Sequence, residues 1–556
     1  MLKADLVLIH APSLYDFREK DVHHGPISDL IPSTPVFELY PVGFLTLLTY
    51  LGKRGYKVRI LNIATQMLMD ASFDVEKEIK KIDAAVYGID LHWMVHVQGA
   101  VEVAKIIKKI WDRPVVFGGF TSSIFWKEIL RNYKQVDYVL SGDTTEEPFK
   151  KLLEYLIEGR GAIEDIPNLS WREGELIKTN GITFVPEDIG GYSIDYSFVA
   201  KEAIKSMKPK AFLPFAKFMQ DPIAMSLAYK GCDFNCITCG GSCNTFKNSF
   251  QRTGIAFKPA EKIAEEILSI NQYMKIPVFL VGDLQFNLKH AKAIVKELKE
   301  NKFDAPIFFE FFKPPNKETL TILEQASDEV ILHISPESHS EKVRNAFGRP
   351  YQNNELEKFI SHVAELNFKR VDLYFMTGLP FQTYASAVET HKYIESITKK
   401  IPESKKILDC FISPLAPFVD PGSIVFKNPD KFGYKLRFND LESHRLAIEN
   451  ATNWKNALNY ETIWMNRDEI AASSYEASKK LIKLKIANGI VEEEKGEQTI
   501  RLINVAKEII EESDKITKPI TIRETVPEGD LYPSKNLLLT LKPKFFTTLI
   551  RTILRL

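Results

Sequence analysis

Four of the five cysteines in this 556-residue chain lie in one glycine-rich segment, Gly231 to Cys243. Cys232, Cys236 and Cys239 have the spacing C-x3-C-x2-C. Thiolates suit iron–sulfur clusters and zinc alike. Three thiolates on a four-iron cluster leave one iron without a protein ligand, whereas structural zinc takes four ligands. Cys243 could supply that fourth ligand, so zinc stays open as the alternative.

The cysteine segment follows a predicted strand at 224–228, in the second of two α/β regions. The other strands predicted in this region lie at 278–281, 307–311, 330–334, 371–376 and 407–412. Helical patterns at 260–273 and 290–300 separate the early strands. Six such strand–helix units favour a partial (β/α)6 barrel, in which chemistry takes place at the strand ends.

The first region, residues 1–150, also alternates strand and helix patterns. Strands are predicted at 5–10, 56–61, 84–89, 114–117 and 136–140, and helices at 43–51 and 101–110. Such alternation implies parallel strands joined by crossover helices. We therefore predict an α/β fold with a doubly wound parallel sheet, whose ligand lies at the carboxyl ends of the strands.

The cysteine spacing after the first strand of a barrel resembles the signature of radical S-adenosylmethionine (SAM) enzymes. The resemblance implies a [4Fe–4S] cluster on Cys232, Cys236 and Cys239, whose open iron chelates the amino and carboxylate groups of SAM. It also implies a low-potential electron donor of the ferredoxin or flavodoxin type and cleavage of SAM to a 5′-deoxyadenosyl radical. Thr238 departs from the pattern, since the family usually has an aromatic residue there.

Further segments in the barrel region resemble the SAM-binding elements of that family, in the same order. Asp283 ends the second strand, where the cofactor's amino group would lie, and Glu337 follows the fourth strand, at the ribose element. Arg344 and Arg349 could pair with the cofactor carboxylate, and Gly378 belongs to the strand that approaches the adenine. The alternatives are a helix cap for Glu337 and a tight turn at Gly378.

Residues 1–150 resemble the cobalamin (B12)-binding domains that are fused to radical SAM barrels. Gly118 and Gly119 match the glycine turn near the nucleotide tail, and cobalamin is the implied cofactor. The Asp-x-His-x-x-Gly motif of other cobalamin proteins is absent, because position 95 is Val after Asp90-Leu91-His92. Trp93 could lie under the cobalt and exclude water; alternatively, it packs at the domain interface while His92 and His96 are exposed to solvent.

Composition excludes several other classes of protein. Lys+Arg and Asp+Glu both number 73, which removes a global electrostatic argument for nucleic acid, and we expect no nucleic-acid partner. A 45% hydrophobic content argues against disorder, and five cysteines argue against a disulfide scaffold. The N-terminus does not read as a signal peptide, and no apolar run is long enough to span a membrane. We expect a cytoplasmic protein.

The predicted organisation has five parts. They are a cobalamin-binding-type domain at 1–150, a connector at 151–220 that contains a hairpin, the barrel at 221–440, a mostly helical domain at 441–531 and a tail at 532–556. The tail holds five basic residues, no acid and many leucines. Such a segment can lie on an anionic membrane surface, which would make the protein peripheral to the membrane, or it can pack back on the protein.

The leading hypothesis is a radical SAM enzyme that abstracts hydrogen from an unactivated sp3 carbon. Carbon–carbon bond formation or methylation would follow, and the basic tail suggests membrane lipid chains as the substrate, as in the archaeal radical SAM fusions that form rings in tetraether lipids. One alternative is a cobalamin-dependent radical SAM methyltransferase acting on a small molecule or peptide. Another is a non-enzymatic zinc- or cluster-binding protein.

Overall fold

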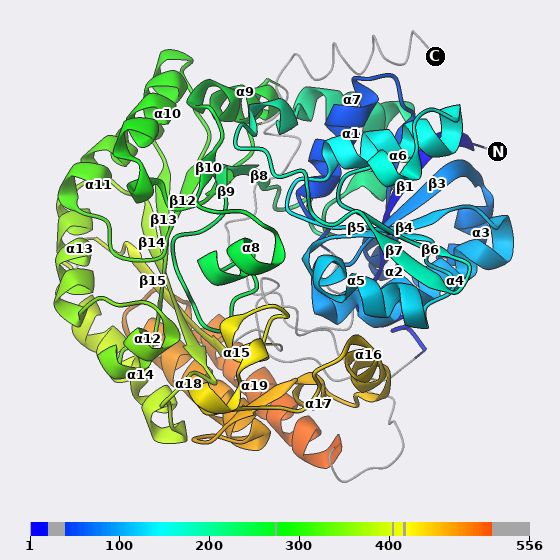
Figure 1. The fold of residues 1–556 in the computed structure, drawn as a ribbon. Helices are drawn as coiled ribbons and strands as arrows, with labels where there is room; N and C mark the ends of the chain where they lie inside the picture. The colour runs from blue at the N-terminus through cyan, green and yellow to red at the C-terminus, as the bar shows by residue number, and fades with distance from the viewer. Residues whose placement is uncertain (1, 20–38, 273–274, 403–404, 415–418, 514–556) are drawn as a thin grey trace.

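Two α/β units lie side by side and each is built on a parallel sheet (Figure 1). The computed structural model describes residues 2–19, 39–272, 275–402, 405–414 and 419–513. In Figure 1 the N-terminal sheet lies on the right and the second sheet, with its outer helices, on the left. The helix that begins at Cys243 is drawn between them.

The N-terminal sheet has the strand order β2-β1-β3-β4-β5-β6-β7, and its first five strands are parallel. Its strands are β1 (Leu2–His10), β2 (Val58–Asn62), β3 (Ile82–Asp90), β4 (Val115–Gly118), β5 (Tyr138–Leu140), β6 (Leu169–Glu173) and β7 (Leu176–Thr179). Its helices are α1 (Gly43–Gly52), α2 (Ile63–Met69), α3 (Val75–Lys80), α4 (Val97–Trp111), α5 (Phe120–Asn132) and α6 (Glu146–Glu158). The expected doubly wound sheet is confirmed.

Strand order reverses between β1 and β3. The chain leaves β1 for β2 on one side, and returns to β3 and then β4 on the other. In doubly wound sheets, ligands bind outside the carboxyl ends of the strands at such a switch point. The last residues of β1 and β3, His10 and Asp90, therefore mark the expected ligand edge.

The hairpin that we placed in the connector belongs to the N-terminal sheet instead. Strand β6 pairs antiparallel with β5, and β7 pairs antiparallel with β6. Their turn is at Gly174 and Glu175, between the paired residues Glu173 and Leu176. Sequence could not assign the hairpin to this sheet, because the pairing partner lies about 30 residues earlier, beyond the reach of local patterns.

The second sheet is the predicted partial barrel of six parallel strands, in the order β15-β14-β13-β12-β11-β8. The strands are β8 (Ala224–Leu227), β11 (Val278–Val281), β12 (Ile307–Phe311), β13 (Val330–Glu337), β14 (Arg370–Thr377) and β15 (Leu408–Pro414). The outer helices are α9 (Ala260–Asn271), α10 (Leu288–Glu300), α11 (Lys317–Leu323), α12 (Glu341–Phe347), α13 (Asn353–Glu365) and α14 (Tyr384–Thr398). This part of the expected fold class is also confirmed.

The C-terminal region is mostly helical, as predicted, with one small antiparallel sheet of two strands. Its elements are α15 (Ile424–Lys427), β16 (Tyr434–Leu436), α16 (Leu441–Asn450), α17 (Trp454–Ala457), β17 (Tyr460–Thr462), α18 (Arg467–Ala487) and α19 (Glu493–Ser513). Helix α18 packs on β15 and α14, and α16 packs on α4. Leu441 and Ile448 of α16 belong to the core of the N-terminal unit. The tail at 532–556 lies outside the described residues.

None of the described helices is both long enough and apolar enough to cross a membrane.

Helix α4 begins close against the chain that leaves β1. A Cβ atom added at Gly99 would lie 1.9 Å from the backbone oxygen of Pro12. We predict that Gly99→Ala lowers the thermal unfolding temperature of the N-terminal unit, because overpacking of this kind costs about 1–3 kcal/mol. The matched control is Gly43→Ala, at a helical position with open space around it. Equal unfolding temperatures for both variants in calorimetry would contradict this packing.

Candidate functional site

Elements far away in the sequence hold the cysteine segment in place. It starts after β9 (Tyr229–Lys230) and ends where α8 (Cys243–Ser249) begins. The backbone N–H of Gly240 donates a hydrogen bond of 2.9 Å to the Asp420 carboxylate. Gly348 has a positive φ of 107°, and a Cβ atom there would lie 2.6 Å from the backbone oxygen of Asn235. The loop is therefore fixed from two sides.

Among the described residues, no three cysteine sulfur atoms lie close enough together to form a single-ion site as they stand. One set of three potential ligand atoms within 4.8 Å of one another occurs among the described residues, and it does not contain a cysteine. A single zinc ion needs all its sulfur ligands at about 2.3 Å, hence close together. Burial raises the pKa of the Cys236 thiol to about 11 and that of Cys239 well above its ordinary value. Because iron binds the thiolate forms, assembly of a cluster here must release protons.

Acidic side chains and one arginine gather beside the cysteines at the barrel mouth. Arg349 lies 3.4 Å from Glu337 (Nη2 to Oε1) and donates a 3.2 Å hydrogen bond to the backbone oxygen of Phe312. Its guanidinium also lies over the rings of Phe234 and Phe312. Burial raises the pKa of Glu310 and of Glu337 to about 7, although Arg349 opposes the shift in both.

Two buried polar atoms of this group have no hydrogen-bond partner within the described part of the chain. They are Oε2 of Glu337, an acceptor, and Nε of Arg349, a donor. A buried polar group without a partner costs about 1–3 kcal/mol. A ligand that carries both an amino group and a carboxylate would satisfy both atoms. The residues present therefore fit the methionine end of SAM next to a cluster on the cysteines.

The other predicted SAM contacts have partners of their own. Arg344 is fully buried and donates to the backbone oxygens of Ser338 and Tyr351 and to Asn353. This geometry supports a structural role for Arg344 and favours Arg349 as the residue that faces the ligand.

Asp283 and Gly378 also make contacts within the protein itself. The Asp283 carboxylate accepts hydrogen bonds from Gln285 and from the backbone of Phe312, and burial raises its pKa to about 6. Gly378 has a positive φ of 92°, and a Cβ atom there would lie 2.3 Å from the Tyr460 hydroxyl. Gly378 therefore leaves room for the Tyr460 side chain from the C-terminal region.

The carboxyl edge of the N-terminal sheet holds the residues predicted for cobalamin. Gly118 ends β4, and Gly119 (φ 108°) lies so close to the backbone of His92 that a Cβ atom would approach it to 2.7 Å. Trp93 is 39% exposed and packs edge-on against His92. His96 is buried, so the alternative that it is exposed to solvent is wrong.

Buried polar atoms without a hydrogen-bond partner in the described ranges occur at this edge too. They include Oγ of Ser13, after β1, Oγ of Ser141, after β5, and Oδ2 of Asp90. Together with the close backbone approach at Gly119, these atoms fit a large polar ligand at the switch point, which is what a cobalamin requires.

A buried ion pair joins this edge to the cysteine segment. Arg252, which follows α8, binds the Asp143 carboxylate through Nε and Nη2, and both side chains are 3% exposed. Lys230, two residues before Cys232, donates to the backbone oxygen of Asp143 at 2.6 Å and to the Thr144 hydroxyl at 3.0 Å. The acidic turn after β5, residues 142–148, is thus fixed to both flanks of the cysteine segment.

Comparisons with known proteins define the class to which these two units belong. Residues 30–152 match the B12-binding domain family, and residues 227–394 match the radical SAM superfamily. The chain therefore carries a B12-binding domain followed by a radical SAM domain, and these domains imply a [4Fe–4S] cluster, SAM and cobalamin as cofactors.

Particular relatives agree with this class. The chain is 27% identical over 265 residues to an uncharacterised methyltransferase of Pyrococcus horikoshii, a match that covers 46% of this chain and 52% of that protein. The chain thus matches about half the length of this curated relative. The fold resembles that of the radical SAM methyltransferase TsrM of Kitasatospora setae, with a TM-score of 0.56, 12% identity and 79% of each chain covered.

A second solved structure has the same arrangement. It is the cobalamin-dependent SAM radical enzyme OxsB with aqua-cobalamin and SAM bound, with a TM-score of 0.57 and 12% identity. The likeness covers 91% of this chain and 71% of that one. At this level of identity the likeness concerns the fold.

We predict that Ala replacement of Cys232, Cys236 or Cys239 removes the iron–sulfur cluster, because two thiolates cannot hold it. Anaerobic reconstitution followed by iron analysis and visible absorption measures this. Cys243→Ala and Cys410→Ala are the matched controls and should keep about four irons per chain. Loss of the cluster in Cys243→Ala with retention in Cys232→Ala would overturn the ligand assignment.

The raised pKa of Glu337 predicts a pH-dependent stability of the ligand-free protein. The folded state holds this proton up to about pH 7 and the unfolded state only to about 4.5. Stability should therefore fall as the pH rises between these two values. Glu337→Gln cannot ionise, so it should raise the thermal unfolding temperature at a pH of about 8 and change it little at about 5.

The matched control for Glu337→Gln is Glu300→Gln on the exposed end of α10. It should show the same small effect at both pH values. If Glu337→Gln behaves like this control, the carboxyl of Glu337 is not held in its neutral form by burial.

Proposed function

We propose that the chain is a cobalamin-dependent radical SAM methyltransferase that acts on a small molecule or a peptide. The observation that carries this proposal is the meeting of two ligand edges. The carboxyl edge of the B12-binding domain and the cysteine segment of the barrel are joined through the buried pair of Asp143 and Arg252. Aromatic contacts of Phe120, after β4, with Phe246 and Phe250 reinforce the same junction.

In this proposal, the chain's own residues bind the cluster, orient SAM and exclude water. Cys232, Cys236 and Cys239 hold the cluster, and Glu337 with Arg349 orient the amino acid end of SAM. When bound, the cluster and SAM supply a radical that removes a hydrogen atom from an sp3 carbon, and a cobalamin supplies a carrier for a methyl group. The buried aromatic residues at the junction keep water from the space between the two edges.

Methyl transfer is favoured over ring formation in lipid chains. The B12-binding domain supplies the site for a methyl carrier, which ring formation does not need. The lipid hypothesis depends on the tail at 532–556, which lies outside the described residues. The proposal has three further parts. They are a contact of that tail with an anionic membrane, a cytoplasmic location and an electron donor of the ferredoxin or flavodoxin type.

The test is anaerobic turnover of the full chain with hydroxocobalamin, a low-potential reductant and SAM that carries a deuterated methyl group. We expect S-adenosylhomocysteine to form only when the corrinoid is present, and candidate small molecules and peptides to gain the labelled methyl group in mass spectra. The Cys232→Ala variant serves as the control and should form no 5′-deoxyadenosine.

Two outcomes would contradict the proposal. Cleavage of SAM to 5′-deoxyadenosine at the same rate with and without corrinoid, and with no S-adenosylhomocysteine, would show that the domain has lost its cofactor. A lipid product that has lost two hydrogens and gained no methyl group would support ring formation instead.

A further inference from the structure

We propose that the carboxylate of Asp420 lowers the reduction potential of the iron–sulfur cluster, because it places a fixed negative charge beside Cys239. Asp420 lies after β15 and shortly before α15, 180 positions beyond the glycine of the cysteine segment that it contacts. The inference rests on the radical SAM part of the proposed function and adds to it a residue that lies outside the C-x3-C-x2-C spacing.

Two hydrogen bonds hold Asp420 against the backbone on either side of Cys239. The backbone N–H of Asp420 donates a hydrogen bond of 3.1 Å to the backbone oxygen of Thr238. Its carboxylate accepts one of 2.9 Å from the backbone N–H of Gly240, through Oδ2. The approach is close, since a Cβ atom added at Gly240 would lie 2.9 Å from the Cβ atom of Asp420. The carboxylate is therefore bound to the residue next to a cluster ligand.

The chain on both sides of Asp420 is fixed as well. The backbone N–H of Val419 donates a 2.7 Å hydrogen bond to the side chain of Asn459, which donates one of 3.0 Å back to the Val419 oxygen. On the other side, the backbone N–H of Val425 donates a 2.9 Å hydrogen bond to the backbone oxygen of Ile237, within the cysteine segment. These contacts keep the carboxylate in one place relative to the cysteines, as a constant electrostatic effect requires.

No cation balances the charge of Asp420 among the residues that the structure describes. Loss of hydration raises the pKa of this carboxyl to about 6, and the hydrogen bond from Gly240 is the effect that opposes the shift. The charge also acts on the nearest cluster ligand: burial, and after it the charge of Asp420, raises the pKa of the Cys239 thiol. A charge without a counterion acts more strongly here than in water, because the local dielectric is lower.

The sign of the effect follows from the charge that reduction adds. Net charge, hydrogen bonds to the sulfur atoms and solvent exposure set the potential of a protein-bound cluster. A reduced cluster has one more negative charge, so a fixed anion beside it disfavours reduction and lowers the potential. The backbone N–H of Gly241 donates to the Cys239 sulfur at 3.2 Å, whereas that of Gly240 is taken by Asp420. In the proposed function the electron cleaves SAM, and a lower potential strengthens the driving force for that cleavage.

The test is a redox titration of the reconstituted full chain at a pH of about 8.5, above the pKa of the Asp420 carboxyl. Electron paramagnetic resonance of the reduced cluster gives the midpoint potential, and iron analysis checks that each variant holds the same cluster. Asp420→Asn removes the charge and keeps an oxygen that can accept from Gly240. We expect it to favour the reduced cluster by roughly tenfold, which corresponds to a rise of about 59 mV for one electron.

Two further variants separate charge from structure. Asp420→Glu keeps the charge and should keep the wild-type potential, and Asp430→Asn, which removes an exposed carboxylate after α15, is the matched control and should also leave it unchanged. If the Asn and Glu variants of Asp420 have the same potential, the charge has no effect and the proposal is overturned.

These measurements need neither substrate nor corrinoid, so their result does not depend on methyl transfer. A wild-type chain that assembles no four-iron cluster would contradict the proposed function itself. A chain with the full cluster and a potential that ignores the charge at position 420 would contradict this inference alone.

Discussion

The buried pair of Asp143 and Arg252 is the interaction on which the rest of the site depends. It joins the acidic turn of the B12-binding domain to the chain that follows α8, while Lys230 binds the same turn from the other flank of the cysteines. Removing one partner of such a buried pair costs about 3–5 kcal/mol, because it leaves an uncompensated charge. The pair helps to fix the two cofactor edges relative to each other, and the proposed methyl transfer between them requires a fixed separation.

Local patterns predicted the elements of the fold, because helix and strand periodicities are properties of neighbouring residues. The six barrel strands and the five parallel strands of the first sheet lie within a few residues of their predicted positions along the chain. The cysteine spacing predicted the metal-binding segment for the same reason, since its ligands lie within one loop. Pairing across the sequence was not predictable in this way, as the hairpin of β6 and β7 shows, because its partner strand is chosen by tertiary packing.

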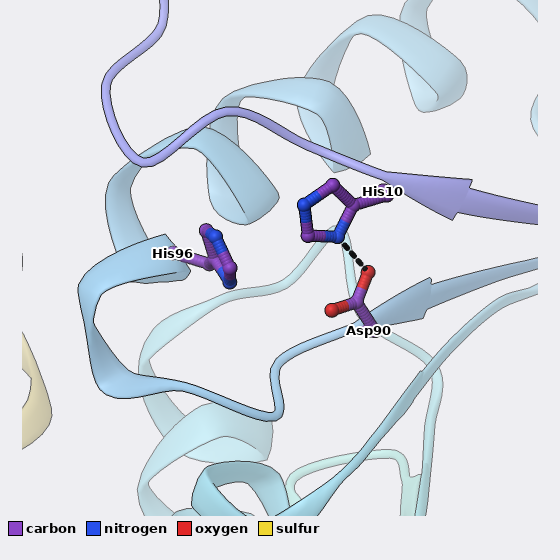
Figure 2. Close-up of side chains that lie close together, drawn as sticks. All are labelled: His10, Asp90 and His96. Atoms are coloured by element: carbon purple, nitrogen blue, oxygen red, sulfur yellow. Dashed lines mark hydrogen bonds and ion pairs between the residues drawn. The ribbon is translucent and has the colours of Figure 1, made fainter. Parts of the chain in front are cut away.

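The candidate site also combines features that local sequence predicts with features that only the tertiary structure reveals. Arg344 and Arg349 are five positions apart, and from the sequence either could bind the cofactor carboxylate. In the structure Arg344 donates hydrogen bonds to backbone oxygens, whereas Arg349 faces Glu337. The turn between them includes Gly348, which has a positive φ, and the two guanidinium groups have different partners in the folded chain. The association of His10 with Asp90 (Figure 2) needed the register of two strands that are 80 positions apart at their ends. No motif records such a pair, because its residues need no fixed spacing.

The packing of α16 on the N-terminal unit has a consequence for how the chain is made. Leu441 and Ile448 complete a core whose other residues are synthesised far earlier. Across the same contact, Tyr133 donates a hydrogen bond to Glu442. At about 5–20 residues per second, translation leaves that surface uncovered for on the order of tens of seconds. The apolar face next to α4 is therefore exposed to chaperones and to other nascent chains during this interval. Helix α16, which is made after the whole barrel, thus completes the core of the first unit.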